Sequence, residues 1–254
     1  MLAVLSPSKT QAIDNQFSCK EFTQPKFLKN SKILVDELRK LSSTKLQSLM
    51  GVSSKLAELN AERFRKFSTP FSMKNSRQAL VVFRGDVYDG IEVGEYKKAD
   101  FLYAQKHIRI LSGLYGVLSP LDLIQPYRLE MKTALKTKQA KDLYGFWGDM
   151  LQNEIEKEVK KSKSRSLVNL ASQEYFKVLR PKHLSVPIVQ VDFKEKNGSN
   201  LRSIALFAKQ ARGMMANYIV RNRLSAPKDL RGFSEAGYQL EPTSSTDRYL
   251  LFVR

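Results

Sequence analysis

The sequence predicts a single-domain α/β protein (mixed α+β), in which a mixed sheet is flanked by helices and a helical hairpin is attached as an appendage. Three observations lead to this prediction. Short apolar runs typical of buried strands alternate with longer segments of helical periodicity. No long Gly/Ser/Pro linker, internal repeat or low-complexity tract divides the 254 residues. Hydrophobic content of 42% and charged content of 27% lie in the soluble globular range, so a large core can form.

A large excess of positive charge is the strongest global feature of the chain. The net charge is +18 at pH 7 and the pI is near 9.9. Such a field attracts polyanions, chiefly DNA or RNA, or an anionic membrane surface, although a generally basic proteome would also produce it. Nine basic residues face only two acidic ones over residues 194–231. This concentration favours a surface that binds a polyanion.

Cysteine content and apolar run length bear on where the protein works. The single cysteine, Cys19, excludes an intrachain disulfide framework and suits a reducing cytoplasm. No apolar run reaches the roughly 20 residues needed to cross a bilayer. Residues 1–10 lack the basic segment and the long apolar segment of a signal peptide. We therefore expect a cytoplasmic protein that does not bind to a membrane.

The first elements are a strand and a helix. Residues 2–5 form a continuous apolar run, which predicts a strand buried on both faces. Residues 6–10 follow as a hydroxyl-rich turn that contains Lys9. Such a loop can hold an anion through backbone N–H groups, although an ordinary strand-ending turn has the same composition. Apolar residues at helical spacing then predict an amphipathic helix over residues 27–41.

Residues 42–67 predict two helices joined by a tight turn. Residues 49–57, Leu-Met-Gly-Val-Ser-Ser-Lys-Leu-Ala, resemble the helix-hairpin-helix motif of DNA-repair proteins, Leu-Pro-Gly-Val-Gly-x-x-x-Ala. In such a turn, backbone N–H groups and the start of the second helix bind a phosphate without reading sequence. The predicted phosphate contacts are Gly51, Val52, Ser53 and Lys55, with Arg63 extending them. Met50 and Ser53 depart from the motif, and a plain helical hairpin with a glycine C-cap is the alternative.

The next segments predict a strand, a turn and a helix. Residues 79–83 are rich in β-branched and aromatic residues, which predicts a short strand. The turn after it contains Asp86. A carboxylate at a strand end is where α/β proteins often place chemistry, although it more often only forms an Asx turn. Helical periodicity then predicts a helix over residues 98–110.

Residues 111–131 combine apolar side chains with glycine, proline and charge. The apolar residues indicate burial, while the glycines and prolines argue against a regular helix or a central strand. Tyr127, Arg128 and Glu130 bring a hydroxyl and charges into this frame, and buried charges are costly unless paired. Either an ion pair of Arg128 with Glu130 or Asp122 fixes a loop, or these residues line a site.

The last part of the chain predicts the remaining strands and a basic helix. The predicted elements are a helix ending near residue 161, a buried strand at 166–170, strands at 187–193 and 201–207 joined by an Asn-Gly turn, a helix at 209–224, and a final hairpin of 238–240 with 249–253. Polar residues follow the strands that end at residues 5, 83 and 170. We expect these strand ends to converge with residues 111–131 on one basic cleft, with Arg128 and Glu130 in its wall.

Segments from the first strand to the last third of the chain carry a family resemblance. They are Ser6-Pro7-Ser8-Lys9-Thr10, Gly85-Asp86-Val87-Tyr88, Leu111 to Leu118, Pro120-Leu121-Asp122, Gln125 to Met131, Phe146-Trp147-Gly148-Asp149, Asn169-Leu170-Ala171-Ser172 with Tyr175-Phe176, and Ala211-Arg212-Gly213. Together they resemble the YaaA peroxide-stress family. The long central motif is highly specific, whereas residues 243–254 match only loosely and nothing is inferred from them.

The resemblance implies a cytoplasmic bacterial protein made under hydrogen-peroxide stress, which limits oxidative DNA damage and keeps unincorporated iron low. It also implies a single-domain α/β fold with a basic cleft and a helix-hairpin-helix. Members of the family bind double-stranded DNA, including bent or branched forms. The resemblance implies no defined reaction.

The first function hypothesis is a DNA-binding protein of low sequence specificity. The residues predicted to bind DNA are Lys9, Gly51, Val52, Ser53, Lys55, Arg63, Lys209 and Arg212. The expected partner is double-stranded DNA, and no protein partner is implied. Attachment of the basic helix at residues 209–224 to an anionic membrane is a weaker alternative.

The second hypothesis is an enzyme that acts on a damaged or modified nucleic-acid base or nucleotide. The catalytic candidates are Asp86, Tyr127, Arg128 and Glu130. Asp86 or Glu130 could act as a general base, and Arg128 could steady an anion. Two histidines and one cysteine offer few of the ligands that iron binding needs. We therefore predict no metal site and no cofactor, and an indirect effect on iron.

Overall fold

The computed structural model describes residues 1–13, 19–198 and 200–254. Its main sheet has eight strands in the order β11-β12-β9-β8-β1-β5-β6, with β10 paired to β9. These strands are β1 Leu2–Leu5, β5 Ile108–Ser112, β6 Gly116–Leu118, β8 Leu167–Leu170, β9 Ile188–Asn197, β10 Asn200–Arg202, β11 Gln239–Leu240 and β12 Tyr249–Val253. The five central strands from β12 to β5 are mutually parallel, and β6, β10 and β11 pair antiparallel. The predicted mixed α/β fold is confirmed.

The first strand occupies the middle of this sheet. Every residue of β1 is buried, and Ala3 pairs with Ile108 of β5 on one side and with Val168 of β8 on the other. A strand covered by helices on both faces needs no polar alternation, which is why the run Leu-Ala-Val-Leu is uniformly apolar. Its position brings the loop after Leu5 to the centre of one edge of the sheet.

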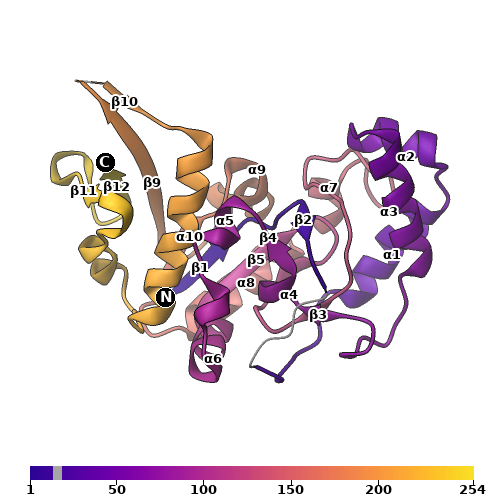
Figure 1. Cartoon of the computed structure of the whole chain (residues 1–254), viewed down its shortest axis with the longest axis horizontal. Coiled ribbons are helices and arrows are strands. Elements are labelled where there is room, and N and C mark those ends of the chain that lie inside the picture. The colour runs from indigo at the N-terminus through magenta and orange to yellow at the C-terminus, as the bar shows by residue number, and fades with distance from the viewer. Residues whose placement is uncertain (14–18, 199) are drawn as a thin grey trace.

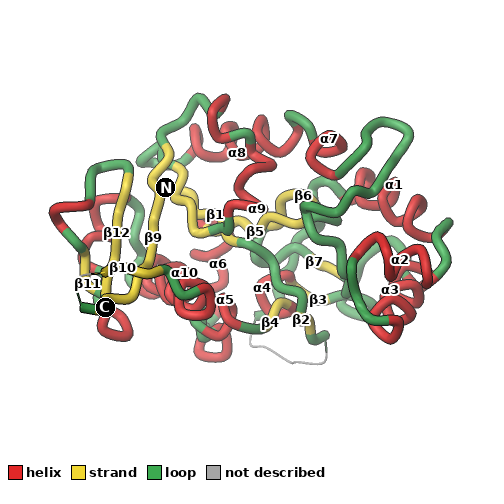
Figure 2. The backbone as a smooth tube through the Cα atoms, turned by 90° about the horizontal axis from the view of Figure 1, so that it is seen from above, coloured by secondary structure: helices red, strands yellow, loops and turns green. Residues whose placement is uncertain are grey.

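Helices cover both faces of the sheet. Figure 2 shows α8 (Met150–Lys161) on one side of the row of strands and α6 (Lys98–His107) and α10 (Ala205–Arg221) on the other. Helix α10 also packs backbone to backbone against the short helix α5 (Asp86–Asp89). A Cβ atom on Gly213 would lie 1.8 Å from the carbonyl oxygen of Val87, so only glycine permits this approach.

Three helices form the end of the molecule that lies farthest from β11 and β12 (Figure 1). They are α1 (Leu28–Arg39), α2 (Ser43–Met50) and α3 (Ser54–Lys66). Gly51 ends α2 in the left-handed conformation, with φ +61°, and Ser53 caps α3 by accepting a hydrogen bond from the N–H of Leu56. The predicted pair of helices with a tight turn is therefore present.

The remaining elements are short. They are the strands β2 Thr10–Gln11, β3 Arg77–Gln78, β4 Phe83–Arg84 and β7 Leu123–Ile124, the helices α4 Ala79–Val82, α7 Leu143–Trp147 and α9 Gln173–Phe176, and the 3-10 helices η1 Val93–Glu95, η2 Lys177–Leu179, η3 Pro181–His183, η4 Pro227–Gly232, η5 Glu235–Gly237 and η6 Pro242–Ser244. Strand β4 pairs with β2, and β3 pairs with β7. These small ladders tie the loops around the sheet edge together.

Four local predictions were wrong. The strand expected at residues 79–83 is the helical turn α4, and only Phe83 enters a strand. Its four residues are all buried, and an apolar run that is buried on every side carries no period that separates helix from strand. The strand expected at 201–207 ends at Arg202, and α10 begins at Ala205.

The two other wrong predictions concern the junction between α6 and β5. Helix α6 stops at His107, and Ile108 starts β5 without a turn between them. Residues 111–131 were expected to avoid a central strand, but Leu111 and Ser112 complete β5, which lies between β1 and β6. Ile110, Leu111 and Ser112 at the end of β5 are all buried, so they lack the alternation of buried and exposed residues that would distinguish a strand from a helix in the sequence.

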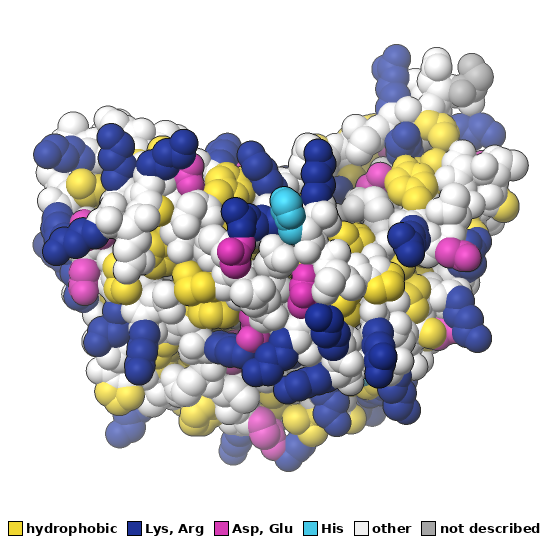
Figure 3. Space-filling model, turned by 180° about the vertical axis from the view of Figure 1, so that it is seen from behind, with side chains coloured by type: hydrophobic (Ala, Val, Ile, Leu, Met, Phe, Trp, Pro, Cys, Tyr) yellow, Lys and Arg dark blue, Asp and Glu magenta, His cyan; other side chains and the backbone are white. Residues whose placement is uncertain are grey.

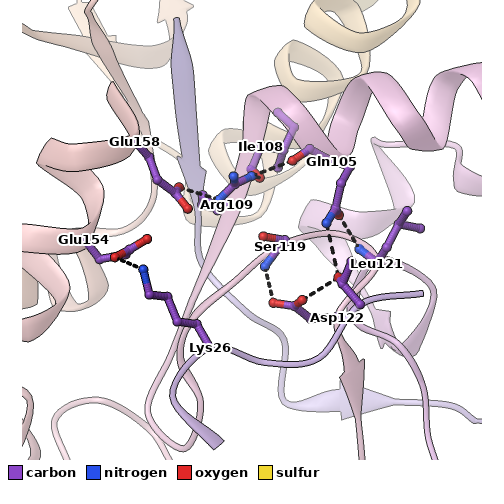
Figure 4. A network of polar contacts seen from close by, with 10 residues as sticks. Lys26, Gln105, Ile108, Arg109, Ser119, Leu121, Asp122, Glu154 and Glu158 are labelled. Atoms are coloured by element: carbon purple, nitrogen blue, oxygen red, sulfur yellow. Dashed lines mark hydrogen bonds and ion pairs between the residues drawn. The ribbon is translucent and has the colours of Figure 1, made fainter. Parts of the chain in front are cut away.

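A polar network, made of residues that do not line the cleft described below, anchors residues 111–131 (Figure 4). The Asp122 carboxylate accepts hydrogen bonds from the Ser119 N–H at 2.7 Å and from the Thr23 hydroxyl at 2.6 Å. Gln105 donates to the Thr23 hydroxyl and accepts from the Leu121 N–H. Asp122 is thus held by neutral donors and does not pair with Arg128. Burial raises the pKa of its carboxyl to about 6, against the lowering effect of the Thr23 and Ser119 hydrogen bonds.

Candidate functional site

The polar loops at the ends of the sheet strands surround one cleft of about 640 Å³. Its walls come from residues 6–11, 84–87, 127–132, 170–175 and 203–212. These are the segments after β1, β4 and β8, the end of the stretch 111–131, and the start of α10. The ends of the parallel strands β1 and β8 meet at one edge of the main sheet, and the antiparallel pairing of β4 with β2, which follows β1, brings the segment after β4 to the same place. Figure 3 shows the surface hollowed at its upper edge, with Lys and Arg side chains on both sides.

Glu130 lies at the centre of a cluster of cations in this cleft. Its carboxylate lies 3.0 Å from Arg128 Nη2, 3.2 Å from Lys9 Nζ and 3.7 Å from Lys132 Nζ. The Glu130 side chain is only 12% exposed, whereas Lys9 and Lys132 extend into solvent. Of the two pairs considered for Arg128, the structure contains the one with Glu130. Arg128 and Glu130 also line the cleft, so the ion pair that fixes the loop is at the same time part of the candidate site.

Two guanidinium groups face the cleft with a donor left over. The Nε atoms of Arg128 and Arg212 are buried and have no hydrogen-bond partner among the described residues. Burial lowers the pKa of Arg212, and the nearby Asp192 carboxylate opposes that effect. A buried N–H without an acceptor costs about 1–3 kcal/mol. Because both residues line the cleft, an anion bound there would meet their guanidinium charges.

Asp86 and Lys209 form the opposite side of the cleft. Their Oδ2 and Nζ atoms lie 3.0 Å apart. Lys209 comes from the second turn of α10, which the contact of Gly213 with Val87 sets beside α5. Both side chains are partly exposed, so this pair is a weak, solvent-screened interaction that a ligand can replace.

Hydroxyl groups line the floor of the cleft. The Ser6 hydroxyl donates to Ser172 Oγ at 3.2 Å and accepts from the Ser172 N–H at 2.8 Å. The hydrogen of the Ser172 hydroxyl is then left to donate to a ligand. The Ser8 hydroxyl instead donates to the Arg84 carbonyl and fixes the loop after β1.

Tyr127 contributes to the cleft in a different way from the other candidates. Its hydroxyl lies 2.6 Å from Ser112 Oγ in the core, and its N–H donates to Gln11 Oε1. Burial raises the pKa of Tyr127 far above the physiological range. This geometry suits a residue that positions the loop better than one that exchanges a proton with a ligand.

The predicted phosphate contacts of the helical hairpin lie apart from the cleft. Gly51, Ser53 and Lys55 are exposed, and Val52 is partly exposed. Arg63 is half-buried, its Nη1 lies 3.5 Å from Asn60 Oδ1, and burial lowers its pKa. The structure therefore divides the predicted residues into two sets. Lys9, Asp86, Tyr127, Arg128, Glu130, Lys209 and Arg212 line the cleft, and the other five belong to the hairpin.

A second, smaller cavity adjoins the cleft at Arg212 and was not predicted. It has a volume of about 480 Å³. Its lining residues are Asn169, Ala171, Gln173, Phe176, Lys177, Pro181, Gln190, Asp192 and Arg212. The signal for Gln190 and Asp192 was their alternation with buried Val189, Val191 and Phe193 along β9, which turns both side chains to one face. Arg84, Lys132 and Glu174 in the main cleft were also missed.

Among the described residues, no helix combines the length and the apolar character needed to span a bilayer. Within the same residues, no group of three or more His, Cys, Asp and Glu side chains is arranged to hold a metal ion.

Comparison with known proteins identifies the family. The family model described as peroxide stress protein YaaA matches residues 1–244. The UPF0246 protein AM1_4276 of Acaryochloris marina (strain MBIC 11017) is 46% identical over 254 residues, which is the full length of both chains. The match spans the helical hairpin, the cleft and the second cavity alike. This protein therefore belongs to the YaaA family of peroxide stress proteins.

Proposed function

We propose that this protein binds double-stranded DNA with low sequence specificity and thereby limits oxidative DNA damage during hydrogen-peroxide stress. Membership of the peroxide stress family supports the physiological setting. The observation that carries the DNA proposal is the charge around the cleft, where six cationic side chains outnumber three carboxylates; a duplex would lie across the mouth of the cleft and not inside it. The cations are Lys9, Arg84, Arg128, Lys132, Lys209 and Arg212, and the carboxylates are Asp86, Glu130 and Glu174.

The helical hairpin supplies a second contact with the phosphate backbone in this proposal. The first N–H groups of α3 lack intrahelical partners by the geometry of any helix, and they follow the exposed turn at Gly51. Lys55 adds a positive charge in the first turn of α3, next to these donors. Contacts of this kind go to sugar and phosphate, so bent or branched duplexes would be bound as well as straight ones.

Free iron would be lowered only indirectly. Two histidines and one cysteine in 254 residues are a poor set of ligands for storing ferrous iron. We therefore assign the protein no role as an iron store. Its effect on iron-dependent damage would come from protection of the DNA, and any fall in free iron would be a secondary consequence. Stoichiometric binding of ferrous iron by the purified protein at micromolar affinity would contradict this part of the proposal.

The decisive measurement is the affinity for a duplex as a function of salt. Neutralisation of about six phosphates predicts a log–log slope of about −5. Lys55→Glu should weaken binding about tenfold, alike for all sequences, because it places a negative charge against the backbone. Lys157→Glu on α8 is the matched control, since Lys157 is exposed and the net charge changes equally. Salt-insensitive binding would exclude the proposal, and equal losses in both variants would remove the hairpin from it.

A second candidate function is an enzyme acting on a damaged or modified base or nucleotide. It is favoured by the cleft volume of about 640 Å³, which is typical of small-ligand sites and far too small for a duplex. Asp86 or Glu130 would be the general base, once a ligand has displaced its lysine or arginine partners. Duplexes with oxidised bases or abasic sites should then yield a product detectable by mass, which Glu130→Gln abolishes. Binding without any product would leave the first function alone.

A further inference from the structure

The second cavity differs from the cleft in the kind of polar groups that it offers. The cleft holds a clear excess of cations, whereas this cavity presents a carboxylate, the aromatic ring of Phe176, one lysine, Lys177, and three amides, those of Asn169, Gln173 and Gln190. Arg212 lines both spaces, so its guanidinium group lies at the point where they adjoin. A ligand that reached from one space to the other would pass this side chain.

Asn169, Gln190 and the Asp192 carboxylate form a directed chain of hydrogen bonds. Asn169 Nδ2 donates to Gln190 Oε1 at 2.7 Å, and Gln190 Nε2 donates to Asp192 Oδ1 at 2.9 Å. The other end is fixed as well, because Asn169 Oδ1 accepts from the Ala171 N–H at 2.9 Å. The orientations of both amides are therefore set before any ligand arrives, and the chain ends on a carboxylate.

Asp192 keeps capacity to accept further hydrogen bonds. An ionised carboxylate has about four acceptor positions, and here Gln190 and the Tyr249 hydroxyl use two of them. On the other side, the buried Nε of Arg212 has no acceptor among the described residues. The cavity thus offers an acceptor for amino groups, and the guanidinium group of Arg212 at its border offers N–H donors for a carbonyl or phosphate oxygen. The edge of a nucleobase that carries an amino group has this complementary pattern.

Size supports the same assignment. Neither space is large enough for a duplex, but both volumes are in the range of small-ligand sites, and the two spaces share Arg212. A base can be read in such a cavity only after it has left the stack, because its hydrogen-bonding edge is otherwise inside the duplex.

We propose that the cavity lined by Asn169, Gln190 and Asp192 is a base subsite for one nucleotide whose phosphate lies in the cleft beside Arg128 and Arg212. In DNA that nucleotide would be an extrahelical one, and this part of the proposal rests on the proposed binding of DNA. Guanine is the best match, since its adjacent N1–H and amino donors can both reach one carboxylate.

The first experiment uses free ligands and does not depend on DNA binding. Calorimetric titration compares guanosine monophosphate with ribose 5-phosphate, which has the phosphate but no base. We expect the nucleotide to bind about tenfold more tightly. Asp192→Asn should remove this difference and leave ribose 5-phosphate unchanged, whereas Arg212→Met should weaken both ligands. Equal affinity of the two ligands, or a nucleotide affinity that Asp192→Asn leaves intact, would overturn the base subsite.

Controls separate the loss of recognition from the loss of fold. Asp247→Asn changes the net charge equally at a fully exposed carboxylate outside both cavities and should leave both affinities unchanged. Each variant is also followed by thermal unfolding. If Asp192→Asn unfolds, Gln190→Glu is the second variant. It replaces an amide donor by a like charge beside Asp192 and should abolish the preference for the nucleotide. A preference that survives in a folded Gln190→Glu protein would again overturn the proposal.

The second experiment uses DNA and tests the extrahelical nucleotide. A duplex with a single bulged guanosine should bind more tightly than the matched duplex, and Asp192→Asn should bind both equally. If neither duplex binds while guanosine monophosphate does, the proposed DNA function fails and the base subsite stands for a free nucleotide. If both duplexes bind alike in the native protein, the extrahelical nucleotide is excluded while DNA binding stands.

Discussion

The helical hairpin and the cleft carry the same kinds of positive side chain in opposite circumstances. Lys55 of the hairpin is exposed, and no ion pair involves it within the described residues. Lys9, Arg128 and Lys132 of the cleft instead share the carboxylate of Glu130. An exposed charge binds an anion at once, whereas a paired charge must exchange one partner for another. Under the proposed function, the hairpin would therefore add non-selective attraction to DNA, and the cleft would select a ligand that competes with Glu130.

The space around the backbone also differs between the two regions, being crowded at Gly213 beside the cleft and open at Gly51 in the hairpin. Alanine substitutions at these two glycines give the largest expected effect on stability. Gly213→Ala forces a Cβ to within 1.8 Å of the Val87 carbonyl oxygen, so α10 has to move away from α5. We expect a loss of about 3 kcal/mol or more in unfolding free energy, together with loss of ligand binding in the cleft. Gly51→Ala meets no atom within 4 Å and suffers only its φ of +61°, for a loss of about 1 kcal/mol. Urea unfolding measures both, and equal losses would contradict the comparison.

The response to pH should also separate the two regions. Asp122 anchors the stretch that ends in the cleft, and burial raises the pKa of its carboxyl from 3.8 to about 6. The folded state then binds the proton more tightly than the unfolded state, so this contribution to stability is full below about pH 4 and is lost as the pH rises through 6. A shift of that size corresponds to about 3 kcal/mol. In the hairpin, the hydrogen bond from Lys66 lowers the pKa of the exposed carboxylate Glu62, which is the opposite direction.

Asp122→Asn tests this assignment. The difference in unfolding free energy between the native protein and the variant should shift toward the variant by about 2–3 kcal/mol between pH 4 and pH 7. Glu62→Gln is the matched control, and because Lys66 lowers the pKa of Glu62, its difference should not shift toward the variant as the pH rises. A constant difference for Asp122→Asn would show that the carboxyl titrates normally.

Neutral substitutions at Glu130 and Lys55 should change duplex affinity in opposite directions. Glu130→Gln releases Lys9, Arg128 and Lys132 from their shared carboxylate, so we expect duplex binding to strengthen about threefold to tenfold at low salt. Lys55→Gln removes one phosphate contact and should weaken binding by a similar factor. Fluorescence anisotropy with a labelled duplex measures both. If Glu130→Gln weakens binding instead, Glu130 itself contacts the ligand.

The smallest expected effect is on the salt dependence of duplex affinity, which should distinguish Lys55 of the hairpin, unpaired among the described residues, from the paired Lys9 of the cleft. Lys55→Gln should make the log–log slope about 1 unit less steep, because one counterion fewer is released. Lys9→Gln should change the slope by less than that, since Lys9 is already neutralised by Glu130 in the free protein. Equal changes for the two variants would mean that the Lys9–Glu130 pair is absent in solution.

Patterns that are local in the sequence allowed part of this structure to be predicted. The uniformly apolar run at residues 2–5, the Asn-Gly turn after β9 and the pairing of β11 with β12 were expected from a few neighbouring residues each, as was the helical hairpin. The convergence of polar strand ends was predictable because parallel strands place their carboxyl ends together. The turn α4 was not, since all four of its residues are buried and carry no usable period.

The partners of individual side chains depend on contacts that no local pattern contains. Lys9 and Glu130 are 121 positions apart in the sequence and 3.2 Å apart in space. The pairing of Asp86 with Lys209 likewise depends on the close approach that Gly213 permits. Gln190 and Asp192 were visible as an alternating pattern on β9, but only the fold turns that face toward Asn169 and Arg212.

The central position of β1 has a consequence for how the chain is made. Its four residues are synthesised long before their neighbours in the sheet, which begin at Ile108 and Leu167. At about 5–20 residues per second, translation would take roughly 10–30 s to supply the second neighbour. The hairpin, by contrast, has its main helix contacts, between α2 and α3 and between α3 and α1, once Lys66 has been added. Folding of this protein should therefore start at the appendage and finish at the sheet, with an apolar first strand that needs protection from aggregation during synthesis.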